Sequence, residues 1–434
     1  MNAAHQVPRN NPRPSAWHGV APAHWTPTKL KYVLHENRNS STGLFPPGAI
    51  SFGQVVQKEM LNSDTLASYQ DVKAGEFLVN PINLNYDLKS LRVALSKIDV
   101  RVSPAYIVLK HVKGNEPRYL RWLLYLFDVA HMKTLGAGVR QTISFGDMGN
   151  CVAFLPPLRE QADIANFLDE QTARIDSLIA AKTLLVEKLR AFQYSRSSHL
   201  MTRGLIDGAP LTQSGFPEVG AVPSHWMVKR LKFLGDVRSG VAKGKDLGDK
   251  DTVLLPYLRV ANVQDGYVDL NEVSEIEIAT SDATRYLLCK GDVLMNEGGD
   301  NDKLGRGAVW QGQIEPCIHQ NHVFAVRLQN PDDADWVSRF TSTAAARAYF
   351  FLRSKQSTNL ASINQSNVRE LPVPMPPDDE RAAILAEVVR MSKATSDLVD
   401  HAIGHIERLR EYRSSLISAA VTGQLDINSY KEAA

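Results

Sequence analysis

The side chains best suited to chemistry in this sequence are arginines, lysines and amides in polar loops beside glycine. Arg, Lys, Asn and Gln can make bidentate contacts with base edges, and Arg and Lys also hold phosphates. Residues of these kinds are therefore candidates for DNA contacts, the alternative for each being an ordinary polar loop residue. The candidates are Arg38, Asn39, Asn80, Asn83, Arg101, Arg238, Lys243, Lys245, Arg259, Asn262, Asn296, Asn301, Lys303, Arg306, His319 and Asn321.

Catalytic motifs are missing from the sequence. The glycines around Lys245 lack the Ser or Thr that follows Lys in a phosphate-binding loop. The string Asn-Pro-Ile-Asn at 80–83 is similar to the Asn-Pro-Pro-aromatic box of amino-methyltransferases, but its last two residues differ. His401 and His405 have the i, i+4 spacing of metal ligands without the Glu of a metalloprotease helix. We predict no catalytic residue, no metal and no cofactor in this chain.

The composition excludes several classes of protein. With 49 Lys and Arg against 47 Asp and Glu, the formal net charge of the 434 residues is only +2, so bulk charge does not hold the chain to nucleic acid or to an anionic membrane. Three cysteines without CxxC spacing argue against a disulfide framework or structural zinc and favour a cytoplasmic location. No apolar run reaches the ~18 residues of a membrane span. Residues 1–20 are polar and Pro-rich, which predicts a disordered lead.

Two strings of the sequence occur twice in the same order. PAHWTPTKLKY at 22–32 matches PSHWMVKRLKF at 223–233, and PPLREQADI at 156–164 matches PPDDERAAI at 376–384. The first pair is offset by 201 residues and the second by 220. Two matches in one order predict a tandem duplication, with 19 extra residues in the first part of the second copy.

Each copy is predicted to contain a globular part and a helical part. Short apolar runs broken by Gly, Pro, Asn and Asp predict mixed α/β domains. Residues 158–203 contain no Pro or Gly, and both helical segments have apolar residues at steps such as three, four and seven. This pattern predicts helices that pack against another helix. The predicted fold class is α+β, with two similar mixed α/β domains separated by two long antiparallel helices. The predicted segments are 21–155 and 222–375 for the domains, 156–205 and 376–425 for the helices, 206–221 for a linker and 426–434 for a tail.

The apolar stripe of the two helical segments is predicted to pack helix against helix or against another subunit. At 1.5 Å per residue, ~40 helical residues span roughly 60 Å, too long for one small globule to cover. The economical arrangement pairs the two helices as an antiparallel rod. The packing candidates are Leu178, Leu185, Leu189, Phe192, Leu398, Leu409, Tyr412 and Leu416.

These features together resemble the specificity subunit of type I restriction–modification systems, over essentially the whole chain after residue 15. The resemblance rests on several strings in fixed order. They are Pro-x-His-Trp at the start of each copy, Gly-[Asp/Glu]-x-Leu-x-Asn at 75–80 and 291–296, Val-Ser-Pro-Ala-Tyr at 102–106, Tyr-Leu-Arg-Val-Ala-Asn at 257–262, His-Gln-Asn-His at 319–322, and the ending at 413–423. The first helical segment departs from that ending at 195–203.

The resemblance implies a non-catalytic role in a larger complex. Each domain would read one half of a bipartite, asymmetric double-stranded DNA target, and the helices would set the gap and dock methyltransferase subunits, two in number. The resemblance also implies restriction subunits as partners and no membrane. S-adenosylmethionine, ATP and Mg would belong to the partners. Three alternatives stay open: a methylation-only system, a coiled-coil assembly scaffold without sequence reading, and a fused chain with its own chemistry.

Overall fold

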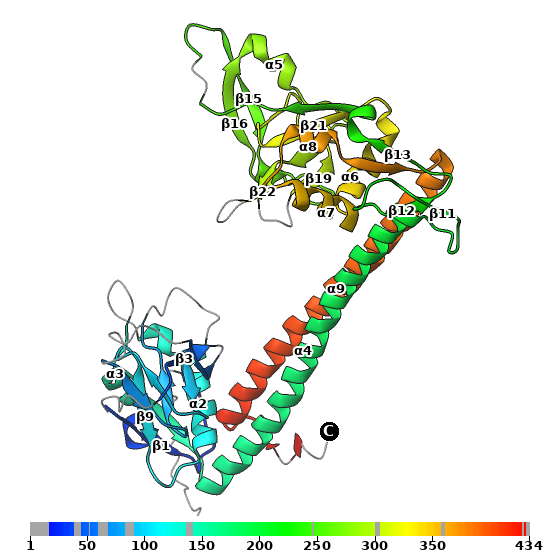
Figure 1. Cartoon of the computed structure of the whole chain (residues 1–434). Helices are drawn as coiled ribbons and strands as arrows, with labels where there is room; N and C mark the ends of the chain where they lie inside the picture. Colours follow the sequence, from blue (N-terminus) through cyan, green and yellow to red (C-terminus); the bar gives the residue numbers. More distant parts are fainter. Residues whose placement is uncertain are drawn as a thin grey trace, which may run out of the picture. The chain divides into compact units, whose positions relative to one another are not determined.

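The protein, seen here as a computed structural model, forms two compact units (Figure 1). Unit 1 comprises residues 1–182 and 404–434, and unit 2 comprises residues 183–403. The border between the units crosses both long helices, so each unit holds one globular region and part of each helix. The structure describes residues 17–38, 45–51, 53–59, 68–82, 91–135, 142–244, 247–299, 304–356, 361–427 and 429–430.

Unit 1 is built on a four-stranded antiparallel sheet. Its strand order is β2 (Leu34–Glu36), β9 (Ile107–His111), β6 (Phe77–Val79) and β7 (Val93–Leu95). The central strand β6 is buried on both faces: Phe77 and Val79 join the larger core of the unit, while Leu78 joins a smaller core with Val100 and Val108. This follows from the alternation of side chains along a strand. The strand pairs β3 (Gly48–Ser51) with β4 (Gln54–Gln57) and β5 (Gln70–Val72) with β8 (Val100–Val102) complete the β structure, together with β1 (Thr26–Lys29) and β10 (Val152–Leu155).

Helix α2 (Pro117–Ala130) packs against the β7 edge of this sheet. Proline at its first position and a Glu116 side chain that accepts from the Arg118 backbone N–H start the helix. Leu120, Leu123 and Phe127 then fall on one face and are fully buried. The short helix α3 (Phe145–Gly149) follows, with η1 (Leu30–Tyr32) and η2 (Met132–Thr134) as single turns elsewhere in the unit.

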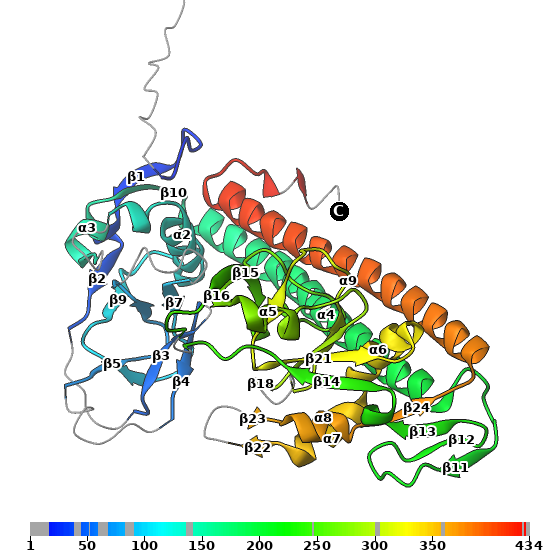
Figure 2. The same ribbon diagram turned by 90° about the horizontal axis from the view of Figure 1, so that it is seen from above.

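Unit 2 repeats this sheet and adds to it. Its four-stranded sheet has the order β14 (Gly235–Ser239), β21 (Val323–Leu328), β17 (Val293–Asn296) and β19 (Gly307–Val309), which corresponds strand by strand to that of unit 1. Helix α6 (Ala334–Thr341) packs against β19 as α2 packs against β7. The further elements are β15 (Thr252–Leu258), β16 (Ser274–Ala279), β20 (Ile318–His319), β18 (Gly298–Gly299), β22 (Lys355–Gln356), β23 (Ala361–Ser362), β13 (Met227–Arg230), β24 (Pro372–Met375), α5 (Thr280–Tyr286), α7 (Ala344–Arg353), α8 (Gln365–Arg369), η3 (Leu231–Phe233), η4 (Val260–Asn262) and η6 (Pro331–Asp333). Figure 2 shows β14 beside β21, and the additional strands β15 and β16 side by side.

The long helices are α4 (Leu158–Arg203) and α9 (Asp378–Val421). Within unit 1 they run antiparallel, because Asp176 pairs with Arg413 at 2.9 Å while Lys182 contacts His405. Within unit 2 the same direction holds, with Gln193 donating to Ser392. Both helices lie inside the predicted segments 156–205 and 376–425.

The apolar residues predicted to pack these helices divide into two groups. Leu416 is buried, and Leu189 and Leu409 are partly buried against apolar clusters. The other five side chains are between 45% and 59% exposed, so they form no buried seam within this chain. A helix in a two-helix pair covers only one side of its partner, and apolar residues on the remaining sides face solvent. The exposed five are Leu178, Leu185, Phe192, Leu398 and Tyr412.

The repeated Pro-x-His-Trp string ties each globular region to the start of a long helix. In unit 1, Glu160 in the first turn of α4 accepts from Trp25 Nε1 at 2.9 Å and contacts His24 Nε2 at 2.8 Å. In unit 2, Glu380 in the first turn of α9 accepts from Trp226 Nε1 at 3.1 Å. The strand after each Trp pairs with the strand before each helix: β1 with β10, and β13 with β24. The repeat therefore encodes a junction.

The predicted extent of the disordered lead is wrong. Residues 1–20 are not all a disordered lead, because Trp17 and His18 are buried in the core of unit 1; residues 1–16 lie outside the described residues. The linker predicted at 206–221 contains β11 (Leu211–Gln213), which pairs with β12 (Ala221–Pro223) as a hairpin. Trp17 and His18 are ordered by ring contacts with residues distant in the sequence, Phe127 and Phe154. In the described part of the chain, no helix has the length and apolar character needed to cross a membrane.

Candidate nucleic-acid interface

The predicted DNA-contact residues gather at one end of the four-stranded sheet of unit 2. Because neighbouring strands are antiparallel, the last residues of β14 and β17 meet the first residues of β21: Ser239 is opposite Phe324, and Asn296 is opposite Val323. The described parts of the loops that leave this end carry three of the candidates in unit 2, Lys243, Arg306 and Asn321. The candidates Lys245, Asn301 and Lys303 lie outside the described residues.

Close backbone contacts hold two of these loops together. The Val241 N–H donates to the His319 carbonyl at 2.8 Å, and the Asn321 N–H donates to the Val241 carbonyl at 2.9 Å. A side chain at Gly240 would place its Cβ 1.9 Å from the His319 carbonyl oxygen, so only glycine permits this approach. The exposed Lys243 and the half-buried Asn321 thereby come from loops joined by main-chain hydrogen bonds.

Unit 1 has the equivalent loop end. The last residues of β2 and β6, Glu36 and Val79, stand opposite Leu109 and Ile107 at one end of the sheet. The exposed Arg38 follows β2 and makes an ion pair with Glu36 at 3.0 Å. The half-buried Asn80 follows β6, and its side-chain oxygen accepts from the Ile82 N–H. The candidates Asn39 and Asn83 lie outside the described residues.

Three of the candidates are buried and serve the domain itself. Asn262 accepts from the Arg259 N–H and donates to the carbonyls of Asp269 and Glu272. Asn296 is fully buried and donates to the carbonyls of Val260 and Val263. His319, also fully buried, donates from Nδ1 to the Val323 carbonyl at 2.6 Å. Their assignment as DNA-facing residues is therefore corrected: these side chains satisfy buried backbone groups.

Four arginine candidates are half-buried, and two of them have defined partners. Arg238 on β14 pairs with Asp292 at 3.0 Å, and Arg306 donates to Gln264 Oε1 at 2.6 Å. Arg101 on β8 and Arg259 before η4 also keep part of their side chains exposed. These four retain solvent access for a phosphate or a base edge, in contrast to the buried amides.

The string Gly-[Asp/Glu]-x-Leu-x-Asn forms the same turn in both units. Glu76 accepts from the Lys73 N–H and pairs with Lys110 at 3.2 Å, and it is only 4% exposed. Asp292 likewise accepts from the Cys289 N–H and pairs with Arg327. Each carboxylate follows a glycine with positive φ and lies across from a cation on the neighbouring strand. The string is therefore a structural signature, and its two carboxylates are not among the predicted DNA-contact residues.

The burial of His319 makes the stability of unit 2 depend on pH. Burial lowers the pKa of His319 to about 4, whereas an unfolded histidine titrates near 6.5. Between these values the unfolded chain binds the proton and the folded unit does not. The free energy of unfolding is therefore highest above about pH 6.5 and falls as the pH decreases toward 4. We expect unit 2 to lose about 2 kcal/mol from this residue between pH 7 and pH 5.

The measurement is urea unfolding of the full chain at the two pH values, followed by hydrogen exchange of peptides from unit 2. His319→Gln, which keeps a donor near the Val323 carbonyl, is expected to show a smaller loss on acidification than the unchanged chain. His322→Gln, at an exposed histidine in the same loop, is the control and should retain the full loss. An unchanged pH dependence in His319→Gln would contradict this assignment.

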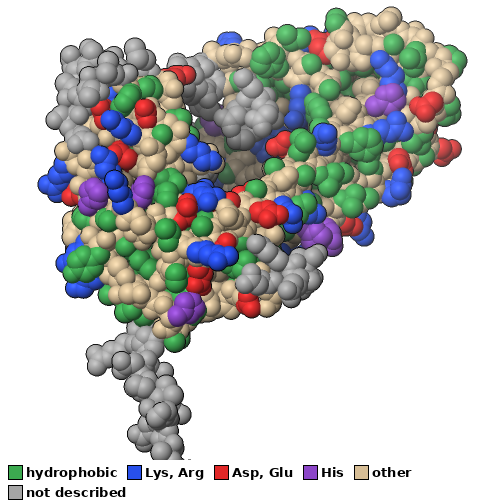
Figure 3. Space-filling model, turned by 90° about the horizontal axis from the view of Figure 1, so that it is seen from below, with side chains coloured by type: hydrophobic (Ala, Val, Ile, Leu, Met, Phe, Trp, Pro, Cys, Tyr) green, Lys and Arg blue, Asp and Glu red, His purple; other side chains and the backbone are tan. Residues whose placement is uncertain are grey.

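The charged surface is mixed. Figure 3 shows one face on which Lys and Arg side chains alternate with Asp, Glu and apolar ones. Within the described ranges no three His, Cys, Asp or Glu side chains are grouped so that they could hold a metal ion. Charges of both signs are therefore interspersed on this face, which is not uniformly basic.

The curated relatives found by sequence are specificity subunits of type I restriction enzymes. The chain is 26% identical over 223 residues to the putative MjaX specificity subunit of Methanocaldococcus jannaschii, covering 50% of each protein. It is 25% identical over 277 residues to the EcoKI specificity subunit of Escherichia coli K12, covering 62% of this chain and 57% of that protein. The chain thus spans about half the length of these relatives. No family model matches it.

One solved structure has the same fold over nearly its whole length. This structure comes from work on complex assembly and conformational transition of the type I R-M system. The match covers 93% of this chain and 99% of the other chain, with a TM-score of 0.67 and 15% sequence identity. The relatives confirm the resemblance drawn from the sequence, and the structural neighbour confirms a mixed α/β fold with long helices.

Proposed function

We propose that this chain is the DNA-recognition subunit of a type I restriction–modification complex, with the chemistry carried out by partner subunits. The observation that carries the proposal is the recurrence, in two units, of one sheet whose loop end bears polar and cationic side chains. Its loops differ between the units: Arg38 and Asn80 in one, Lys243, Arg306 and Asn321 in the other. Different side chains select different bases, so the two domains read different halves of an asymmetric target.

The long helices set the gap between the two half-sites. Two readers on a stiff spacer recognise half-sites at a fixed separation, and a separation near one turn of DNA, ~34 Å, keeps both on one face of the duplex. Support comes from the uninterrupted 46 residues of α4 and from the Trp–Glu junctions, Trp25–Glu160 and Trp226–Glu380, which fasten each domain to a helix start. A tandem duplication accounts for the matched junctions.

The helices also dock the methyltransferase subunits. Five apolar side chains on α4 and α9 remain about half exposed, among them Phe192 at 59% and Leu398 at 57%. Exposed apolar side chains on a helix surface commonly form protein–protein interfaces. S-adenosylmethionine, ATP and Mg then belong to methyltransferase and restriction subunits, and the target adenine leaves the stack into the methyltransferase pocket.

The test is a methylome of domain-exchange variants. The chain is co-expressed with its methyltransferase subunit in a host free of DNA methylation, and modified adenines are mapped by single-molecule sequencing. We expect a split, asymmetric motif with a fixed gap. Exchanging residues 222–375 for the corresponding domain of another specificity subunit should change one half of the motif and leave the other half intact. Exchanging 21–155 should change the other half.

Helix length gives an independent control. Inserting one helical turn within 170–200 should lengthen the gap while both half-sites keep their sequence. A domain exchange that altered both halves together would refute independent reading. A complex that assembles with its methyltransferase subunit but modifies no adenine and shifts no duplex would favour the assembly scaffold instead.

A further inference from the structure

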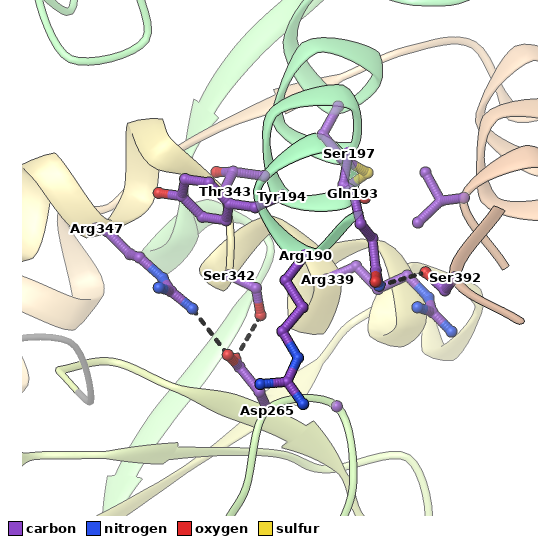
Figure 4. A pocket seen from close by; sticks show the side chains of 13 residues that line it. Arg190, Gln193, Tyr194, Ser197, Asp265, Arg339, Ser342, Thr343, Arg347 and Ser392 are labelled. Atoms are coloured by element: carbon purple, nitrogen blue, oxygen red, sulfur yellow. Dashed lines mark hydrogen bonds and ion pairs between the residues drawn. The ribbon is translucent and has the colours of Figure 1, made fainter. Parts of the chain in front are cut away.

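Unit 2 contains a hollow that the recognition loops do not account for. It has a volume of about 500 Å³ and lies where α4 and α9 face helices α6 and α7 and the turn after η4. Polar side chains from each of these elements line it, as Figure 4 shows. They include Arg190, Gln193 and Tyr194 on α4, Ser392 on α9, Arg339 on α6 and Arg347 on α7.

One acidic side chain in the hollow is already engaged. Asp265 pairs with Arg347 at 2.8 Å and accepts from the Ser342 hydroxyl at 2.6 Å. The guanidinium of Arg347 also lies 5.0 Å from the ring centre of Tyr194, which fixes its position further. These contacts orient Arg347 at the wall and use both carboxylate oxygens of Asp265.

Arg190 and Arg339 bring two more positive charges that have no carboxylate of their own in the part of the chain that the structure describes. Arg190 is exposed and Arg339 is half-buried. In Figure 4 both side chains extend into the hollow beside Asp265 and Ser392. Asp265 is the sole acidic residue among the lining residues, against three arginines. The lining therefore carries an excess of positive charge.

The equivalent hollow of unit 1 shows how such arginines are neutralised within the chain. It too measures about 500 Å³ and lies between α2 and the long helices. There Asp169 pairs with Arg121 at 2.8 Å and with Arg118 at 3.5 Å, and Asp176 pairs with Arg413 at 2.9 Å.

The acidic positions of unit 1 have no counterpart in unit 2. With the offset of 220 residues between the helical repeats, Asp169 corresponds to Val389 and Asp176 to Ser396. Helix α9 thus carries no carboxylate at either of the two corresponding positions. The two hollows share their place in the fold and differ in whether the arginines are compensated.

We propose that the hollow of unit 2 binds a phosphate group, held by Arg190 and Arg339. Guanidinium groups form charge-assisted, forked hydrogen bonds with phosphate oxygens, and hydroxyl and amide groups such as Ser392 and Gln193 supply neutral partners. Resting on the proposed function, the source of the phosphate is the backbone of the bound duplex. This contact anchors the second recognition domain without reading sequence, because phosphates carry no base information.

The experiment measures duplex binding by the full chain in complex with its methyltransferase subunit, over a range of salt concentrations. The variant is Arg190→Gln with Arg339→Gln, and the control is Arg285→Gln, an exposed arginine on α5 outside the hollow. Losing two phosphate contacts should weaken binding to cognate and unrelated duplexes alike, by roughly 10-fold or more near 0.1 M salt, and reduce the slope of log K against log salt by about 1 to 2. The control should leave both unchanged.

A second arm titrates inorganic phosphate into the same proteins and follows binding by calorimetry. Weaker duplex binding with a reduced salt slope identifies the DNA backbone as the source. Phosphate binding that the double variant loses, with duplex binding unchanged, identifies a small phosphate ligand. If neither quantity changes in a variant whose thermal unfolding matches the unchanged chain, the site is refuted. If the unchanged complex binds no duplex, the proposed function fails, while the phosphate arm still decides the site.

Discussion

Asp292→Ala is expected to destabilise unit 2 by about 3–5 kcal/mol, the range for removing one partner of a buried ion pair. The carboxylate is 1% exposed and contacts two arginines: Arg238 at 3.0 Å, and Arg327 at 2.8 and 2.7 Å. It also accepts from the Cys289 N–H at 2.8 Å. Alanine leaves a half-buried guanidinium without a counter-charge and a backbone donor without its acceptor. Because Arg327 keeps 42% exposure and can turn to solvent, we expect a value in the lower half of the range.

Urea unfolding combined with hydrogen exchange measures this loss separately for each unit. Peptides from β14, β17 and β21 should lose protection, while peptides from the sheet of unit 1 keep theirs. Asp236→Ala is the matched control, since Asp236 lies on β14 with a 67% exposed side chain and only a 3.7 Å contact to Arg369. It should change stability little. Equal effects of the two variants would show that Asp292 is not the central counter-charge of the sheet.

Gly423→Ala is expected to destabilise unit 1 by about 2–4 kcal/mol, from backbone strain and overpacking together. Gly423 ends α9 with φ of 72°, a conformation that a side chain disfavours. An added Cβ would lie 2.4 Å from Pro22 Cδ and 2.9 Å from Trp25 Cζ2. Trp25 is held by Glu160, so it cannot move away without breaking the junction at the start of α4.

Gly114→Ala separates the two contributions to this effect. Gly114 belongs to the same unit and has φ of 94°, but an added Cβ would meet no atom within 4 Å. It should cost only the backbone strain, about 1 kcal/mol. The difference in unfolding free energy between the two variants, measured in urea, is the cost of displacing Trp25. If the two variants were equally stable, the packing of the helix end against Pro22 and Trp25 would contribute nothing.

Local patterns in the sequence were sufficient for the main elements. The apolar spacing places both long helices, because helix formation depends on residues three and four apart and on end signals such as Glu160 and Glu380. Apolar runs bounded by turn residues place β6, β9, β17 and β21 for the same reason. The Pro-x-His-Trp string is visible as a repeat in the sequence. The glutamate that accepts a hydrogen bond from its Trp, in the first turn of each long helix, lies in the second repeated string.

The functional roles of individual polar residues could not be read from local patterns. Three predicted DNA-contact residues are of types that can contact base edges, yet they are buried and hydrogen-bond to backbone groups. They are Asn262, Asn296 and His319. Trp17 and His18 stand in a polar lead, yet they are buried in the core of unit 1. Burial depends on which distant segments cover a residue, and the neighbouring sequence does not contain that information.

The sequence by itself determined the mixed α/β character of the domains, the two long helices, the repeated strings and the resemblance to type I specificity subunits, because periodicity, end signals and repeated strings are properties of contiguous residues. Only the tertiary structure decided which loops share one end of a sheet and that Arg190, Arg339 and Arg347 line one hollow around Asp265. These four side chains come from segments up to 157 residues apart in the sequence. Their charge balance is set by three-dimensional proximity, since electrostatic interaction depends on distance in space and not along the chain.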